Sequence, residues 1–119
     1  MSDVRCAHDI EQILREIMLE FRSLESILLN LEQDWSPSES YELSYLNMPR
    51  GKVAHNIKVI RHFLGESECS PRSAQYVQED VVSFLRNFDN PFFETKYKNQ
   101  INCVVSALTS LSLRLKAYC

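Results

Sequence analysis

Apolar residues recur every three or four positions over most of the chain, a spacing that predicts α-helices. The longest such pattern covers residues 8 to 34, where the spacing alternates between four and three without interruption at Ile10, Leu14, Ile17, Phe21, Leu24, Leu28 and Leu31. Ile13, Met18 and Ile27 widen this stripe. A wide stripe favours packing inside a bundle over the narrow seam of a two-stranded coiled coil.

The middle of the chain contains a second amphipathic helix with a short segment before it. Residues 38 to 47 fit a short helix or a loop, and we favour the short helix. The following helix, residues 50 to 64, would have Pro49 in its first turn, where the missing N–H is harmless. Gly65 would end it as a left-handed stop. Its apolar stripe consists of Val53, Ile57, Ile60 and Leu64.

Two further helices complete the pattern. One is expected to begin with Ser70 as its N-cap and Pro71 in its first turn, and to end before Asp89-Asn90-Pro91. The last covers residues 95 to 118, with an apolar stripe of Tyr97, Ile101, Val104, Leu108, Leu111, Leu115 and Tyr118. Because the links between the last three helices are short, consecutive helices should be antiparallel. The sequence therefore predicts one domain, residues 1–119, of the all-α class: an antiparallel up-down-up-down four-helix bundle with an extra short helix at 38–47.

Composition and charge narrow the range of partners. The chain is 45% hydrophobic and 24% charged with two glycines, values typical of a folded, helix-rich protein and not of a disordered one. The net charge is −3 and the basic residues are scattered in sequence, which argues against nucleic acid as a partner. No apolar run is long enough to span a membrane, and the segment Met1–Arg5 lacks the apolar core of a signal peptide. We therefore expect a cytoplasmic protein with no membrane partner.

The four cysteines, Cys6, Cys69, Cys103 and Cys119, show neither Cys-x-x-Cys spacing nor paired histidines at zinc-finger distance. No metal site and no cofactor are therefore expected. Free thiols in a reducing compartment are the simplest interpretation. The even number leaves a disulfide framework open if the chain is a secreted protein without its leader.

His55 is the candidate for chemistry. At roughly 100° per residue it lies almost opposite the apolar stripe of its helix, a position where core-building does not require a histidine. Lys58 follows one turn later on nearly the same side, so a cation can reach whatever the imidazole carries. An exposed imidazole is nucleophilic near neutral pH and can form a bond to phosphorus. The alternative is an ordinary solvated histidine that happens to precede a lysine.

Ala54, His55, Ile57, Lys58 and Gly65 match the phosphoacceptor motif of a known family. The chain here resembles the histidine-containing phosphotransfer domains, which include the amino-terminal domain of the bacterial chemotaxis histidine kinase. The segments 20–32 and 77–85 resemble the family's first long helix and the helix that follows the motif.

The resemblance implies a four-helix bundle that carries a phosphoryl group in a two-component or phosphorelay pathway. His55 would be the phosphoacceptor and Lys58 would offset the phosphoryl charge, while Asn56, Val59 and His62 would belong to the docking surface. The partners would be a response-regulator receiver domain and a sensor histidine kinase. Such a phosphocarrier has no catalytic machinery of its own.

Val59 departs from the motif, because the family has glycine at this position. The stretch Val59-Ile60-Arg61-His62 is bulkier than the small residues that normally leave the imidazole open to a partner. This departure leaves two interpretations open: an active phosphotransfer protein, and a degenerate member that binds its partner without transferring phosphate.

Two other classes remain as alternatives. Arg50 and His55 have the Arg, four variable residues, His spacing that resembles the motif of HEPN-type helical ribonucleases, although Gly51 stands where that family prefers a polar residue. Cys6 and Cys119 would fall at the same end of a bundle, an arrangement similar to that of secreted short-chain helical cytokines. Cytokine bundles need long crossover connections, for which the link at 89–94 is too short.

Overall fold

The computed structural model describes residues 2–34, 40–65, 69–88 and 97–118. They form four helices: α1 (Ser2–Asp34), α2 (Ser40–Leu64), α3 (Pro71–Asn87) and α4 (Lys98–Lys116). The described part of the chain contains no strand, so the predicted all-α class is confirmed. None of these helices is long and apolar enough to cross a membrane.

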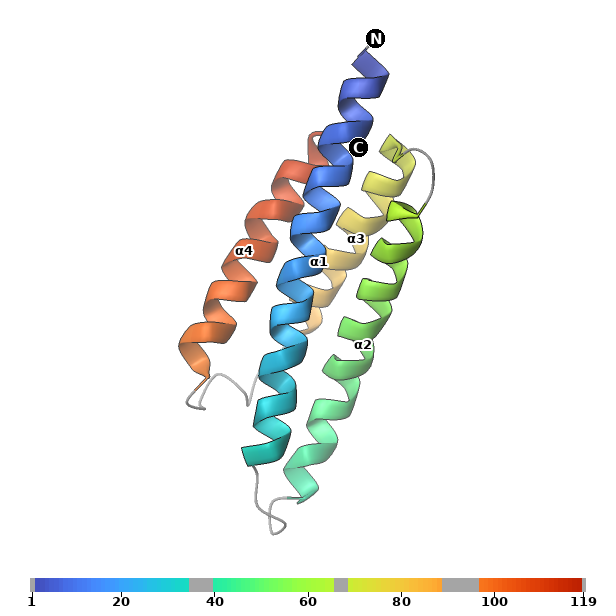
Figure 1. Ribbon diagram of the computed structural model, residues 1–119. Coiled ribbons are helices and arrows are strands. Elements are labelled where there is room, and N and C mark those ends of the chain that lie inside the picture. Colours follow the sequence, from blue (N-terminus) through green and yellow to red (C-terminus); the bar gives the residue numbers. More distant parts are fainter. Residues whose placement is uncertain (1, 35–39, 66–68, 89–96, 119) are drawn as a thin grey trace.

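The four helices alternate in direction around one core (Figure 1). α1 packs against α2 and α4, and α3 packs against the same two helices from the other side of the bundle. Each helix is antiparallel to the next along the chain, which confirms the predicted up-down-up-down topology. Cytokine bundles instead follow an up-up-down-down order, so the observed topology does not favour the cytokine alternative.

The core is built mainly from the predicted apolar stripes. Every stripe position of α1 from Ile10 to Leu31 is buried, and α4 contributes Ile101, Val104, Leu108, Leu111 and Leu115. Three aromatic rings join α1 to α3: Phe84 meets Phe21 edge-on at 5.2 Å between ring centroids and stacks on Phe88 at 5.1 Å. Full burial of one such ring stabilises the fold by about 1.5–3 kcal/mol, so this cluster is a main support of the bundle.

α2 begins earlier than the sequence predicts. Residues 40–49 are helical and run without a break into the histidine-bearing segment, so the prediction of a separate short helix at 38–47 is wrong; residues 38 and 39 lie outside the described residues. Pro49 is therefore inside the helix and not in its first turn. In general, a proline inside a helix removes one backbone hydrogen bond and crowds the carbonyl four residues earlier, at a cost of about 3 kcal/mol. Packing of a long helix on its neighbours outweighs such local preferences.

The junction between α2 and α3 combines one confirmed prediction and one correction. Ser70 caps α3 as expected: its hydroxyl accepts a hydrogen bond from the Ser73 N–H while the Ser73 hydroxyl accepts one from the Ser70 N–H, and Pro71 occupies the first turn. Gly65 is not a left-handed stop, because neither glycine has a positive φ. Its N–H instead closes the last turn of α2 on the carbonyls of Arg61 and His62, at 3.1 and 3.2 Å.

Candidate functional site

His55 is exposed in the second half of α2, as the apolar stripe predicts. Its side chain is 61% exposed, whereas Val53, Ile57 and Ile60 are buried. Lys58, one turn further along, is exposed as well. The imidazole and the ammonium group are therefore both open to solvent on the outer surface of α2.

The carboxylate of Asp80, on α3, faces the His55 ring. Its Oδ2 atom lies 4.0 Å from His55 Nε2. This oxygen is buried and has no hydrogen-bond partner among the residues that the structure describes. Burial raises the pKa of the Asp80 carboxyl above its ordinary value of 3.8; the nearby His55 lowers this pKa and Glu79 raises it further. A protonated imidazole would thus stabilise an ionised Asp80 that is otherwise poorly solvated.

A shallow hollow of about 350 Å³ lies between α2 and α3 next to this pair, with Asn56 and Phe84 in its lining. Asn56 is only 5% exposed, and its side-chain amide donates a hydrogen bond to the Lys52 carbonyl at 2.8 Å. Little of this side chain reaches the surface, although the sequence placed it in the docking surface. The reason is its register, since position 56 falls between Val53 and Ile60 on the buried stripe.

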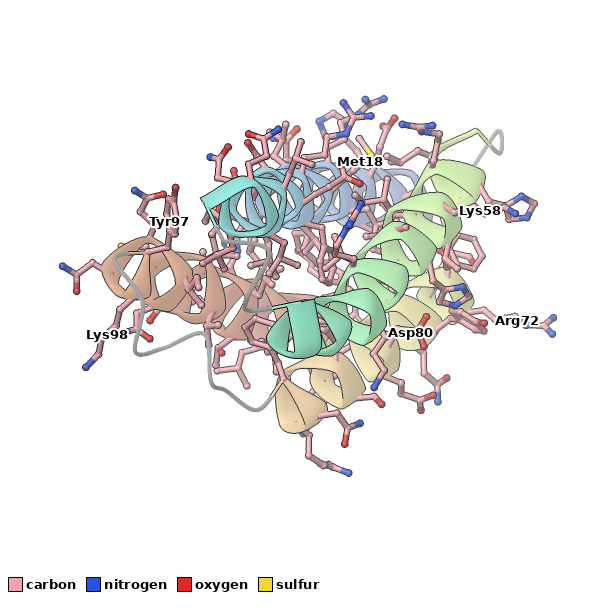
Figure 2. All side chains as sticks on the ribbon, turned by 90° about the horizontal axis from the view of Figure 1, so that it is seen from below. Met18, Lys58, Arg72, Asp80, Tyr97 and Lys98 are labelled. Carbon is pink, nitrogen blue, oxygen red and sulfur yellow. The ribbon has the colours of Figure 1, made fainter. Side chains whose placement is uncertain are left out.

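A second hollow of the same volume opens on the other side of His55. Its lining residues, which we call the histidine face, are His55, Lys58, Val59, His62, Phe63 and Tyr76. The Phe63 ring packs edge-on against the rings of His62 and Tyr76, with centroids 5.7 Å apart in both cases. Figure 2 shows Lys58 of α2 and Arg72 and Asp80 of α3 along this flank of the bundle. The fold therefore gathers His55, Lys58, Val59 and His62 around a small apolar surface.

No hollow lined by the described residues contains both Arg50 and His55. Arg50 lines a hollow between α1 and α2, whereas His55 lines those on the α3 side. Five residues of an α-helix correspond to a rotation of about 140° between the two side chains. Within the described part of one chain, the arginine and histidine of the nuclease-like motif thus line different hollows.

The cysteines add no second site in the described part of the chain. Cys69 is buried with its thiol 3.8 Å from the Phe63 carbonyl, Cys103 is exposed, and neither forms a disulfide. The side chains of Cys6 and Cys119 lie outside the described residues, so the expectation of four free thiols stays a prediction for that pair. Among the described residues no group of three His, Cys, Asp or Glu side chains could hold a metal ion.

Asp80 was not predicted from the sequence as the partner of His55. One signal was present: Asp80 is three residues after Val77 and four before Phe84, which are both buried. A carboxylate at the edge of an apolar stripe is expected to be partly buried and to need a partner. The partner itself could not be identified, because the sequence does not state which faces of α2 and α3 meet.

Comparisons of the chain with protein-family models, with curated proteins and with solved structures find no significant match. The resemblance to phosphotransfer domains therefore rests on the sequence motif alone and stays a prediction.

Proposed function

We propose that this bundle is a histidine phosphotransfer protein of a two-component or phosphorelay pathway, with His55 as the phosphoacceptor. The observation that carries the proposal is an exposed imidazole on a bundle helix, next to the apolar surface of Phe63 and Tyr76. A solvated nucleophile beside a docking surface is what a phosphocarrier requires, because the partner must reach the imidazole and exclude water around it.

In the proposed reaction a lone pair on a His55 ring nitrogen attacks the phosphorus of an aspartyl phosphate on a receiver domain. The new N–P bond forms as the P–O bond to the aspartate breaks, and the carboxylate leaves with the electron pair. The proton on the other ring nitrogen passes to solvent. Lys58 offsets the added negative charge. The reverse sequence delivers the phosphoryl group to another receiver, and the receiver supplies the metal ion and acidic residues while this chain supplies a positioned nucleophile.

The charges of Asp80 and Lys58 favour one side of the His55 ring for the incoming phosphoryl group. An ionised Asp80 carboxylate 4.0 Å from Nε2 repels an incoming phosphoryl group on the α3 side, whereas Lys58 attracts it from the outer side. The proposal therefore places the phosphoryl group on the side of the ring away from Asp80, towards the hollow that His55 and Lys58 both line.

Val59 favours a second version of this function. It is partly buried, lines the histidine face and stands one turn from His55. A branched side chain at this point restricts how closely a receiver can approach the ring. The second version is a degenerate member that keeps the docking surface and binds a receiver or kinase without transfer.

The test uses receiver domains phosphorylated in the presence of magnesium. Wild-type protein is expected to remove the label and to carry it in an acid-labile, base-stable form, as a phosphoramidate does. His55→Gln should abolish the label without changing helicity, because an exposed side chain contributes little to stability. His8→Gln is the matched control, since His8 is also exposed but lies near the start of α1, and it should be labelled normally.

Three outcomes separate the interpretations. Label on the wild type that disappears in His55→Gln and persists in His8→Gln supports phosphotransfer. Binding of a receiver or kinase without label supports the degenerate version. If the wild type neither takes label nor binds across a panel of receivers, the proposal is wrong in both versions.

A further inference from the structure

The opposite flank of α2, where it meets α1, carries two neighbouring hollows of about 640 and 660 Å³. They share Arg22, Glu25 and Ala54 and so form one continuous depression, which we call the basic groove. Asp80, His62 and Tyr76 of the α3 side do not line it. The basic groove is therefore a separate feature from the histidine face, with Lys58 at the boundary between them.

The described lining of the basic groove is strongly cationic. Arg22 of α1 and Arg50, Lys58 and Arg61 of α2 face it, against one carboxylate, that of Glu25. All four cations are exposed. Within the described residues, Arg22, Lys58 and Arg61 form no ion pair with a carboxylate. Their charges are available to a ligand, in a chain whose net charge is −3.

The groove also contains two of the smallest residues of α2, Gly51 and Ala54, both exposed. A Cβ atom added at Gly51 would meet nothing within 4 Å, so packing inside the bundle does not require a glycine there. A glycine inside a helix costs about 1 kcal/mol relative to alanine. Its smooth surface would instead let another backbone approach closely.

We propose that the basic groove binds an acidic α-helix of a partner protein. Lys58 and Arg61 lie about one helical turn apart on α2 and line the same hollow as Arg22 of α1. Gly51 and Ala54 leave room for the partner helix, and Leu29 and Ile57 offer it apolar contact. Carboxylates on both flanks of such a helix would meet the arginines and the lysine.

Two features of the groove favour a protein helix over nucleic acid. Glu25 lies in both hollows and would repel an unbroken row of phosphates, whereas a helix can present a neutral or basic residue to it. The described lining also contains no aromatic side chain, and base stacking on aromatic rings is the usual support for single-stranded nucleic acid.

The experiment is an NMR titration of the isotope-labelled full chain with a synthetic helical peptide that carries glutamates on both flanks of an alanine and leucine stripe. Amide shifts are expected at Gly51, Ala54 and Glu25. Gly51→Gln, which fills the open space above the helix, and the double variant Arg22→Gln with Arg61→Gln should each weaken binding by about tenfold or more. Arg72→Gln, an exposed arginine of α3 (Figure 2), is the matched control and should bind as the wild type does. Added salt should weaken the binding, because it screens exposed charges.

The alternatives are measured in the same way with a glutamine version of the peptide, oligouridylate and phosphatidylserine vesicles. The proposal is supported if the amide signals of the groove shift only with the glutamate peptide, and if these shifts are lost in Gly51→Gln and kept in Arg72→Gln. Equal or stronger binding of the glutamine peptide, oligouridylate or vesicles overturns it, as does the absence of groove shifts with the glutamate peptide. Unchanged peptide binding by His55→Gln would show that binding in the basic groove does not depend on phosphotransfer by His55.

Discussion

The two flanks of α2 offer partners opposite kinds of surface, although they belong to one helix. Towards α3, an imidazole and a buried carboxylate oxygen lie beside packed aromatic rings. Towards α1, exposed cations surround a depression with small residues in its lining. The candidate site on the α3 flank thus includes buried groups, whereas the basic groove on the α1 flank is lined mainly by exposed side chains. Substitutions of similar size should consequently have different effects on the two flanks.

Truncation of an apolar side chain should show the largest difference. Phe84→Ala on the α3 flank removes a ring that contacts both Phe21 and Phe88, and we expect a loss of about 3–5 kcal/mol in the free energy of unfolding. Leu29→Ala on the α1 flank removes a side chain that is 45% exposed and should cost less than about 1 kcal/mol. Urea unfolding followed by circular dichroism measures both. Equal losses would contradict the difference between the flanks.

Val59→Gly and Gly51→Ala should change the stability of the fold by smaller amounts and in opposite directions. Val59→Gly removes a half-buried side chain and introduces a flexible backbone, so it should destabilise the fold by about 1 kcal/mol while increasing phosphoryl transfer to His55. Gly51→Ala should stabilise the fold by about 0.5–1 kcal/mol, since its Cβ meets no neighbour, and should leave transfer unchanged. Thermal unfolding and receiver-dephosphorylation rates are the two measurements. Unchanged or slower transfer in Val59→Gly would show that Val59 does not obstruct the ring.

The smallest effect is expected at Asp80. Because burial raises the pKa of this carboxyl above 3.8 in the folded state, the native state binds more protons than the unfolded state between the two pKa values. The contribution of Asp80 to stability is therefore greatest below the unfolded pKa and declines as the pH rises through the raised folded pKa. Asp80→Asn lacks this decline, so its stability relative to the wild type should be higher at about pH 7 than at about pH 3, by less than about 1 kcal/mol.

Urea unfolding of both proteins at the two pH values tests this expectation. In a His55→Gln background the partner that lowers the Asp80 pKa is absent, so the pH dependence of the difference should increase. A wild type that gains stability over the variant as the pH rises would reverse the sign and show that the carboxylate is well satisfied.

The bundle itself could be predicted from the sequence to a large extent. The stripes of α1 and α4, the Ser70 cap and the antiparallel topology were all predicted, because each depends on side-chain periodicity or on local turn chemistry. The start of α2 was not, since Pro49 is a strong local signal for a helix start and the sequence gives no measure of the packing that carries the helix through it.

For the candidate site, the sequence by itself determined that His55 and Lys58 are exposed, because exposure on a helix depends only on the angle from the apolar stripe. Only the tertiary structure decided which residues of the other helices lie beside His55 and Lys58. Asp80 reaches the His55 ring, and Tyr76 reaches the histidine face, because α3 packs against one flank of α2. Arg22 and Glu25 complete the basic groove because α1 packs against the other. These contacts join residues far apart in the chain, and the one-dimensional pattern of a helix specifies its buried side but not its neighbours.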